Sequence, residues 1–344
     1  MIIIGLFVIL VIVFLAPFFV KKIEEELELF LFVMGCIAVT ITWQWSAGLV
    51  KEALIEPIKI TIAVLVAGLL FRYLQRSIAH NVNKLAGAIG VKLFSFLAIV
   101  FLGFISSVIT AIIAALLLVE IITYLSLDRK HEIFLVVLAC FSIGLGAALT
   151  PIGEPLSTIV IAKLKGAPYN ADFFFLLRHL WLFISPCIIL LGLLGAILVP
   201  NKLQRRHGLT EDRKENIKDI AIRTAKIYIF VMALVFLGEG FKPIVETYVS
   251  KISYQGLYWL NMVSAVLDNA TLAAAEISPA MSIFQIKSAL LGLLIAGGML
   301  IPGNIPNIIS AGKLKIKSSE WAKIGVPLGL IVMAVYFLLI ISLT

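Results

Sequence analysis

Long apolar runs are the feature that most constrains the fold of this chain. Residues 2–20 and 326–343 carry no charge, and a run of about 20 apolar residues matches the ~30 Å hydrocarbon core of a bilayer. Only 14% of the residues are charged, whereas about 25% are charged in a typical soluble domain. The sequence therefore predicts an all-α polytopic protein of the cell (inner or cytoplasmic) membrane, surrounded by lipid, and excludes soluble and secreted classes.

The distribution of Lys and Arg predicts how the chain crosses the membrane. Two apolar segments, 91–125 and 257–282, are especially long, and each has polar residues in its middle. If both are re-entrant hairpins, 20 of the 28 Lys and Arg residues face one side and 8 face the other. Cytoplasmic loops collect basic residues, which explains the net charge of +8 without a nucleic-acid partner. One full crossing at each segment would weaken this bias, and this alternative stays open.

The loops that this assignment places together can be stated by residue number. The basic, predicted cytoplasmic set is 21–28, 72–92, 126–132, 200–226 and 313–323. The predicted outer set is 43–59, 163–178, 239–256 and 277–287.

The two halves of the chain share an order of parts: a span, a hairpin with a polar tip, a span broken by Pro and Gly, and another span. Residues 106–111 align with residues 264–269, and Pro151 aligns with Pro302. The loop assignment opens the first hairpin to the cytoplasm and the second to the outside, which predicts inverted repeats. Inverted repeats with interrupted membrane segments are typical of secondary transporters that bind substrate at the midplane.

Proline and glycine interrupt the third segment of each half. The predicted structural breaks are Pro151, Gly153, Pro155, Pro302, Gly303 and Pro306. Backbone groups freed by such breaks survive at membrane depth only where protein or a water-filled cavity covers them. Freed carbonyls at helix C-termini attract cations, and helix N-termini attract anions. Two breaks and two hairpin tips that converge would therefore form one small polar chamber.

The side chains of this chamber favour a cation. Asp268 lies in the middle of an apolar hairpin, where a carboxylate costs about 2.5–3.5 kcal/mol, so we interpret it as a cation ligand or proton carrier. Glu154 is the expected second ligand. Its alternative role is structural, because the helix dipole stabilises an acidic residue at a helix N-terminus. Asparagines and hydroxyls can supply neutral oxygens or cap helices. These further candidates are Asn269, Asn304, Asn307, Thr110, Ser106, Ser107 and Thr150. We interpret Glu120 and Glu276, on the returning hairpin arms, as interfacial residues.

These motifs resemble those of the ion transporter superfamily, specifically NhaD-type sodium/proton antiporters and their arsenite-permease relatives. The matching pieces are residues 144–155, Ser-Ala-Val-Leu-Asp-Asn at 264–269, and Gly297-Gly298 followed by Pro302-Gly303-Asn304. The chain departs from the family pattern in two places. Thr110-Ala111 replaces an Asp-Asn pair, and Glu154 replaces an Asp, which leaves the number of ions per cycle open.

The resemblance implies an elevator-type homodimer in which hairpins and broken helices move past a scaffold. The transport domain would comprise residues 91–162 and 257–313. The scaffold helices and the cytoplasmic linker would comprise residues 1–90, 163–256 and 314–344.

The leading functional hypothesis is a secondary active transporter that exchanges Na⁺ or Li⁺ for protons by alternating access, with Na⁺ held by Asp268 and Glu154 and without a cofactor. The alternative is a dicarboxylate or arsenite-like anion transporter of the same superfamily. Two like unit charges 4 Å apart cost about 4 kcal/mol at an effective dielectric constant of 20, so Asp268 and Glu154 disfavour an anion. An enzyme is not expected, because the sequence contains neither His-Glu-x-x-His nor Gly-x-Ser-x-Gly.

Overall fold

The computed structural model describes residues 2–20, 22–23, 26–55, 57–58, 61–62, 65–66, 69, 84–85, 87–125, 127–200, 217–248, 252–267, 269–277, 279 and 281–342. Within these residues the regular secondary structure is helical, without a β-strand. Helices suit a bilayer because they satisfy every backbone hydrogen bond internally. Among the described residues, five segments are long and apolar enough to cross a membrane: Val91–Ile109, Arg129–Ala147, Phe175–Leu198, Thr224–Ile244 and Ser318–Ser342. The predicted all-α, multi-pass membrane protein is confirmed at this level.

The helices follow the predicted apolar segments closely. The elements are α1 (Ile2–Phe19), α3 (Leu27–Thr42), α5 (Val91–Ile109), α6 (Ala111–Tyr124), α7 (Arg129–Ala147), α8 (Pro155–Lys163), α9 (Phe175–Leu198), α10 (Ile217–Tyr248), α11 (Tyr254–Leu260), the 3₁₀ helix η2 (Asn261–Ala265), α12 (Asn269–Glu276), α13 (Ile283–Gly297), the 3₁₀ helix η3 (Ile301–Gly303), α14 (Ile305–Leu314) and α15 (Ser318–Ser342). Most of the predicted span 58–71 and most of the linker 200–218 lie outside the described residues. Helix α10 is longer than the predicted span 219–238. It extends beyond the apolar residues at both ends, into sequence that contains charged residues.

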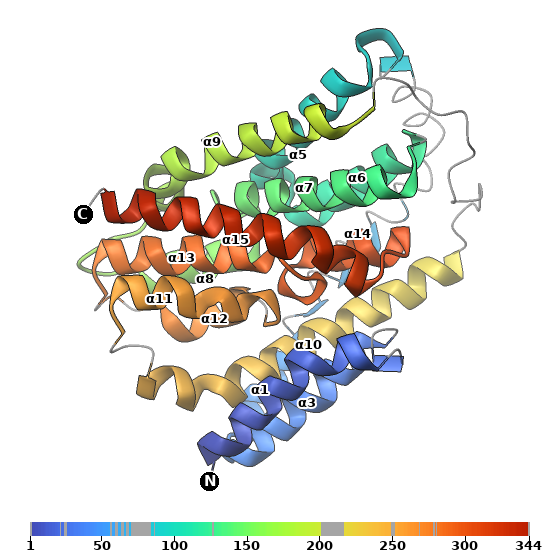
Figure 1. The fold of residues 1–344 in the computed structure, drawn as a ribbon. Coiled ribbons are helices and arrows are strands. Elements are labelled where there is room, and N and C mark those ends of the chain that lie inside the picture. The colour runs from blue at the N-terminus through green and yellow to red at the C-terminus, as the bar shows by residue number, and fades with distance from the viewer. Residues whose placement is uncertain are drawn as a thin grey trace.

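The helices form two groups. Helices α1, α3 and α10 lie together along one side of the molecule, and the remaining helices form the larger body (Figure 1). Helices α3 and α10 pack very closely: a Cβ atom on Gly35 would come within 2.9 Å of the Phe236 side chain. Small residues at such contacts let helix backbones approach in lipid, where van der Waals packing drives association.

Two helix pairs and two interrupted helices make up the centre of the larger body. The first helix pair is α5 and α6, which contact each other and are joined by the single residue Thr110. The second helix pair is α11 with η2, followed by α12. The first interrupted helix is α7 and α8, and the second is α13 and α14. Helix α6 packs against α14, and α12 packs against α8, so each helix pair contacts the interrupted helix of the other half.

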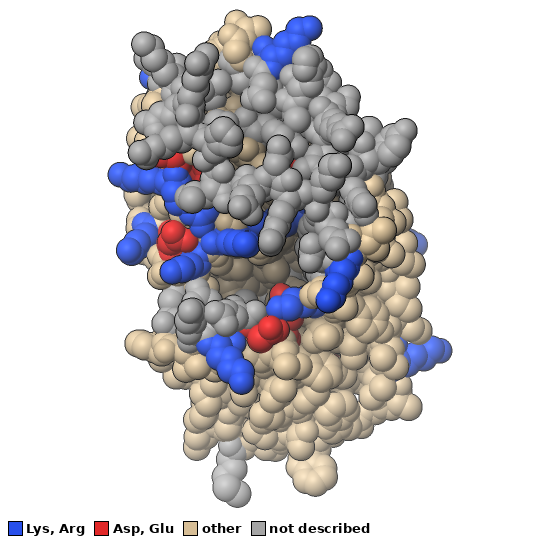
Figure 2. All heavy atoms as spheres, turned by 90° about the vertical axis from the view of Figure 1, so that its right-hand side faces the viewer, with Lys and Arg blue, Asp and Glu red and all other residues tan. Residues whose placement is uncertain are grey.

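Basic residues gather at one end of the molecule. Arg129, at the start of α7, donates hydrogen bonds to the carbonyl oxygens of Leu314 (2.9 Å) and Lys315 (2.8 Å). Lys226 on α10 pairs with Glu26, ahead of α3, at 2.9 Å. Figure 2 shows Lys and Arg side chains grouped on this face, which lies at the right of Figure 1, where α6 and α14 end. The connections 125–128 and 315–317 therefore share one end of the molecule.

A second set of contacts joins connections that the charge pattern assigns to the opposite side. The Lys163 ammonium group at the end of α8 donates to the carbonyl oxygen of Ile277 at 3.2 Å. The Tyr169 hydroxyl donates to the carbonyl oxygen of Met281. In the same connection, the Arg178 guanidinium beside Asp172 holds the pKa of that carboxyl below its usual range. The segment after α8 is thus bound to the segment after α12.

Candidate functional site

The two interruptions have the same backbone geometry. Helix α7 ends at Ala147 and α8 begins after Glu154, whose φ and ψ are −155° and 160°. Helix α13 ends at Gly297 and α14 begins after Asn304, whose φ and ψ are −153° and 145°. These positions match when the sequence is shifted by 150 residues. The predicted pairing of Pro151 with Pro302 is therefore wrong by one residue, and Gly153 pairs with Gly303.

Proline fixes where each second half-helix begins. Pro155 is the first residue of α8, and Pro306 is the second residue of α14. Proline is well tolerated in the first turn, since its missing N–H would have no partner inside the helix. In each case the residue just before this first turn, Glu154 or Asn304, has an extended backbone and is the last residue of the interruption. The side chains of Glu154 and Asn304 are 6% and 4% exposed, so both interruptions carry a buried polar side chain at a helix N-terminus.

The protein's own side chains occupy several of the carbonyl groups that the interruptions free. The Asn307 amide donates to the carbonyl oxygens of Gly297 (2.8 Å) and Leu300 (2.9 Å). In the first interruption the Ser157 hydroxyl donates to the carbonyl oxygen of Ala148 at 2.9 Å. Ser157 and Asn307 are again 150 residues apart. The expected cation attraction of free carbonyls is thus reduced, because these groups already accept hydrogen bonds.

The tip of the first helix pair rests on the first interruption. Thr110 has a left-handed φ of 78°, and its hydroxyl oxygen accepts a hydrogen bond from the Ile113 backbone at 3.4 Å. The Ala111 backbone N–H donates to the carbonyl oxygen of Gly153 at 2.8 Å. The Thr150 hydroxyl donates to the carbonyl oxygen of Ser107. These bonds hold the tip and the interruption together.

The predicted serines of this tip bond to nearby backbone. The Ser106 hydroxyl donates to the carbonyl oxygens of Gly103 (2.7 Å) and Ile143 (3.0 Å). The Ser107 hydroxyl donates to the carbonyl oxygen of Phe104 at 2.7 Å. Their hydrogens are therefore engaged, which leaves only oxygen lone pairs for a ligand.

The second helix pair brings buried polar atoms to the second interruption. A Cβ atom on Gly303 would lie 2.6 Å from the carbonyl oxygen of Ser264, so the two backbones touch. The Ser264 hydroxyl, the Asn307 Oδ1 and the Asn269 Nδ2 are buried without a hydrogen-bond partner among the described residues. Ser264 was not predicted as a site residue, although it opens the motif that contains Asp268. A buried polar group without a partner is costly, and three such groups lie at the second helix pair and the second interruption.

Asp268 itself lies outside the described residues. Its neighbours in the chain, Leu267 and Asn269, are 3% and 2% exposed. The prediction that Asp268 is the central acid therefore stays a prediction.

The second interruption also contacts the first half of the chain. A Cβ atom on Gly144 of α7 would come within 2.5 Å of the Asn304 Nδ2. Nearby, the Cys140 thiol lies 3.4 Å from the Ser310 hydroxyl of α14. Asn304 thus points at the helix that leads into the interruption containing Glu154.

Comparison with known proteins assigns the chain to a family but gives no activity. A family model described as "Protein of unknown function (DUF1646)" matches residues 3–343, which is almost the whole chain. The chain belongs to the DUF1646 family. No curated protein matches the sequence significantly. The function of this DUF1646 chain therefore has to be argued from its site.

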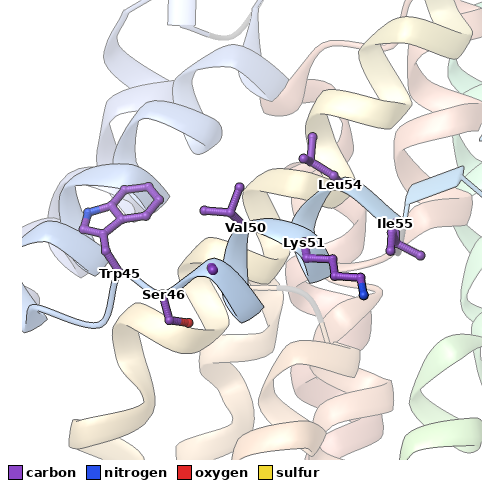
Figure 3. Close-up of a pocket in the computed structure, with 7 residues that line it drawn as sticks. Trp45, Ser46, Val50, Lys51, Leu54 and Ile55 are labelled. Atoms are coloured by element: carbon purple, nitrogen blue, oxygen red, sulfur yellow. The ribbon is translucent and has the colours of Figure 1, made fainter.

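Two further features of the described residues bear on ligand binding: their metal-ligating side chains and a pocket. Among the described residues of this DUF1646 chain, no group of three His, Cys, Asp or Glu side chains could hold a metal ion. A pocket of about 600 Å³ lies elsewhere and is open to the surface (Figure 3). Its lining residues all come from the segment after α3: Trp45, Ser46, Ala47, Val50, Lys51, Leu54 and Ile55. None of these lining residues belongs to the interruptions or to the tips of the helix pairs.

The structure buries the two acids that the sequence analysis interprets as interfacial residues. Glu120 and Glu276 are each only 8% exposed. Both lie on helices that pack against others, α6 against α14 and α12 against α8, so their side chains do not extend into water. Their position near the membrane surface stays a prediction.

Asn307 is expected to contribute more to stability than Ser157. Replacing Asn307 with Ala leaves two buried carbonyl groups without their donor and should lower the free energy of unfolding by about 2–5 kcal/mol. Replacing Ser157 with Ala removes one donor and should cost about 1–3 kcal/mol. Thermal unfolding of both purified variants in detergent measures the difference. Equal unfolding temperatures for Asn307→Ala and the wild type would contradict the structural role.

Proposed function

We propose that this chain is a secondary active transporter that exchanges Na⁺ or Li⁺ for protons across the cell membrane by alternating access. One observation carries the proposal: two interrupted helices of matching geometry each meet the tip of a helix pair. One interruption carries a buried carboxyl group, Glu154, and the other carries a buried amide, Asn304. Interrupted helices paired in this way are typical of transporter substrate sites.

The contacts at the two ends of the molecule support re-entrant helix pairs. Arg129 binds the loop 126–132 to the loop 313–323, and Lys163 binds the loop 163–178 to the loop 277–287. If each helix pair instead made a single crossing, its two ends would lie on opposite sides of the membrane. Each of these contacts would then join loops from opposite sides. In the proposed topology, the first pair enters from the basic, cytoplasmic face and the second from the outer face. The two halves are then inverted repeats.

Competition for one carboxylate couples the two ions. In this proposal Asp268 binds either Na⁺ or a proton, so uptake of one releases the other. Glu154 is the second charged ligand, and Ser264 Oγ and Asn307 Oδ1 provide neutral oxygen atoms beside the second tip. Hard cations prefer such oxygen ligands. Burial disfavours the charged form of a carboxyl group, which brings protonation into the physiological pH range.

The proposal assigns motion to one part of the larger body, and the scaffold comprises residues 1–90, 163–256 and 314–344, which include α9 and α15. Residues 91–162 and 257–313 form the transport domain, and α1, α3 and α10 belong to the scaffold, with the chain acting as a homodimer. The grouping of α1, α3 and α10 along one side of the molecule supports this division, with α10 meeting the transport domain at α12 (Figure 1).

The direct experiment uses inverted membrane vesicles that contain the full chain. A proton gradient is established, and NaCl is then added while the internal pH is followed with a fluorescent probe. The proposal predicts that Na⁺ dissipates the gradient in vesicles with the chain and not in vesicles without it. A gradient that persists for Na⁺ and Li⁺ at every pH tested would contradict the proposal.

Replacing Gly144 with Ala tests the contact between the two halves. The new Cβ would overlap Asn304 Nδ2. Because that amide is the end of a side chain, it can move while the backbone stays in place. We expect normal folding and a loss of exchange rate of about tenfold or more, equivalent to about 1.4 kcal/mol. The matched control is Gly312→Ala, where a Cβ meets nothing within 4 Å. Equal rates for the two variants would contradict the assignment of Asn304.

The second candidate function is anion transport. Helices α6, α8 and α14 all begin at the tip or the interruptions, and helix N-termini favour anions. Glu154 directly precedes α8, and its negative charge would repel an anion there, which disfavours this alternative. Uptake of labelled succinate or arsenite by the same vesicles, without proton exchange for Na⁺, would favour the anion transporter.

A further inference from the structure

A second buried acid lies away from the proposed ion site. Glu276 is the last residue of α12, seven residues after Asn269 and therefore about 10 Å along the helix from it. Its Oε2 accepts a hydrogen bond from the Asn261 Nδ2 at 2.9 Å. Asn261 is 1% exposed, and its Nδ2 also donates to the carbonyl oxygen of Ala289 on α13 at 3.1 Å. The first of these hydrogen bonds joins the two arms of the second helix pair, η2 and α12, and the second joins η2 to α13.

The surroundings of Glu276 supply no ion pair. Helices α8, α10 and α13 pack against α12, and the described charged side chains in the last turn of α8, the second half of α10 and the first half of α13 are Lys163, Glu239, Lys242 and Lys287. Lys163 donates to the carbonyl oxygen of Ile277, and Lys242 pairs with Glu239 at 3.2 Å. Among the described residues, no basic group pairs with Glu276, and its hydrogen-bond partner is a neutral amide.

Two physical effects favour the neutral form of this carboxyl group while the arms are packed together. Burial without a cationic partner penalises a charge. A negative charge at a helix C-terminus also meets the negative end of the helix dipole. The Asn261 amide and the Lys163 ammonium group, which is bonded to the carbonyl oxygen of Ile277, offset these effects only in part, because neither forms an ion pair with the carboxyl group. The charged form becomes favourable only when water reaches the group, which requires the arms of the second helix pair to separate.

We propose that Glu276 is a second proton-binding residue, which holds a proton while the arms of the second helix pair are closed and releases it to water when they separate. The release breaks the carboxyl O–H bond and leaves a carboxylate, and reclosing takes the proton back. Proton binding at Glu276 therefore stabilises the closed arms. The inference rests on the proposed function only for its consequence in transport, because the protonation itself is independent of any transported ion.

Infrared spectroscopy of the purified full chain in liposomes tests the protonation without a transport measurement. The wild type is expected to show the C=O stretch of a buried protonated carboxyl at neutral pH, and Glu276→Gln should lose that band. The control Glu239→Gln, which removes a partly exposed and paired acid, should keep it. Asn261→Ala should keep the band and move its disappearance upward by about one pH unit, because the amide stabilises the carboxylate. A spectrum unchanged in Glu276→Gln, or unchanged titration in Asn261→Ala with the wild-type fold, would overturn the proposal.

The transport consequence is measured in the same liposomes. Glu276→Gln mimics the permanently protonated acid, so exchange at neutral pH should fall about tenfold or more while Glu239→Gln matches the wild type. If the wild type exchanges no cation but Glu276→Gln still loses the infrared band, the antiporter proposal fails and the protonation of Glu276 stands. If exchange in Glu276→Gln equals that of the wild type at all pH values, the proton on Glu276 has no role in the cycle and the inference is overturned.

Discussion

Replacing Asp268 with Asn is expected to abolish Na⁺-driven proton movement, with a loss of at least about 100-fold in rate, or about 2.7 kcal/mol. Asparagine keeps the size and an oxygen of the side chain but cannot bind a proton or neutralise a cation at neutral pH. Since the proposed exchange depends on competition between Na⁺ and a proton for this one carboxylate, both halves of the cycle are lost. The rate is measured as the dissipation of a proton gradient in inverted vesicles.

The matched control is Asp172→Asn, the same chemical change in an exposed ion pair with Arg178. That variant should transport at the wild-type rate. The Asp268→Asn protein should also elute as a single species and unfold at the wild-type temperature, because the change keeps the size of the side chain. Wild-type exchange in Asp268→Asn would exclude this residue as the coupling acid.

Replacing Gly146 with Ala is expected to give the largest loss of stability. A Cβ atom there would lie 1.7 Å from the carbonyl oxygen of Gly103, which belongs to the α5 backbone. Because backbone cannot rotate away as a side chain can, α5 and α7 must separate, and overpacking of this kind costs about 3 kcal/mol or more. The variant should show a lower unfolding temperature and a smaller fraction of monodisperse protein in detergent.

The comparison with Gly312→Ala isolates the clash from the general effect of removing a helical glycine. Alanine is the better helix former by about 1 kcal/mol, so Gly312→Ala should be as stable as the wild type or more stable. A Gly146→Ala protein with the stability of Gly312→Ala would show that α5 and α7 do not approach as closely as described.

The interruptions were predictable from sequence because proline and glycine act locally. Pro155 and Pro306 mark the first turns of α8 and α14, where their missing N–H groups are harmless. The alignment of Pro151 with Pro302 failed because residue identity was matched instead of backbone geometry. The extended residues Glu154 and Asn304 define the true equivalence.

Hydrogen-bond partners were not predictable, because they depend on tertiary contacts. Nothing near Ser157 in the sequence indicates that its hydroxyl reaches the carbonyl group of Ala148. The same holds for Glu276, whose partner Asn261 is 15 residues away on the other arm. A residue near the end of a short apolar segment suggests the membrane surface, and only the packing of α8, α10 and α13 around α12 reveals its burial.

The antiport account rests on a carboxylate that a cation and a proton occupy in turn at the junction of the two halves. The most direct test is exchange by the purified chain in proteoliposomes, with inward gradients of Na⁺, Li⁺ or K⁺ applied in turn over a series of pH values. The account predicts that Na⁺ or Li⁺ entering the liposomes drives protons out, and that raising the external proton concentration competitively reduces cation entry. Cation entry that leaves the internal pH unchanged and is insensitive to external pH would contradict it.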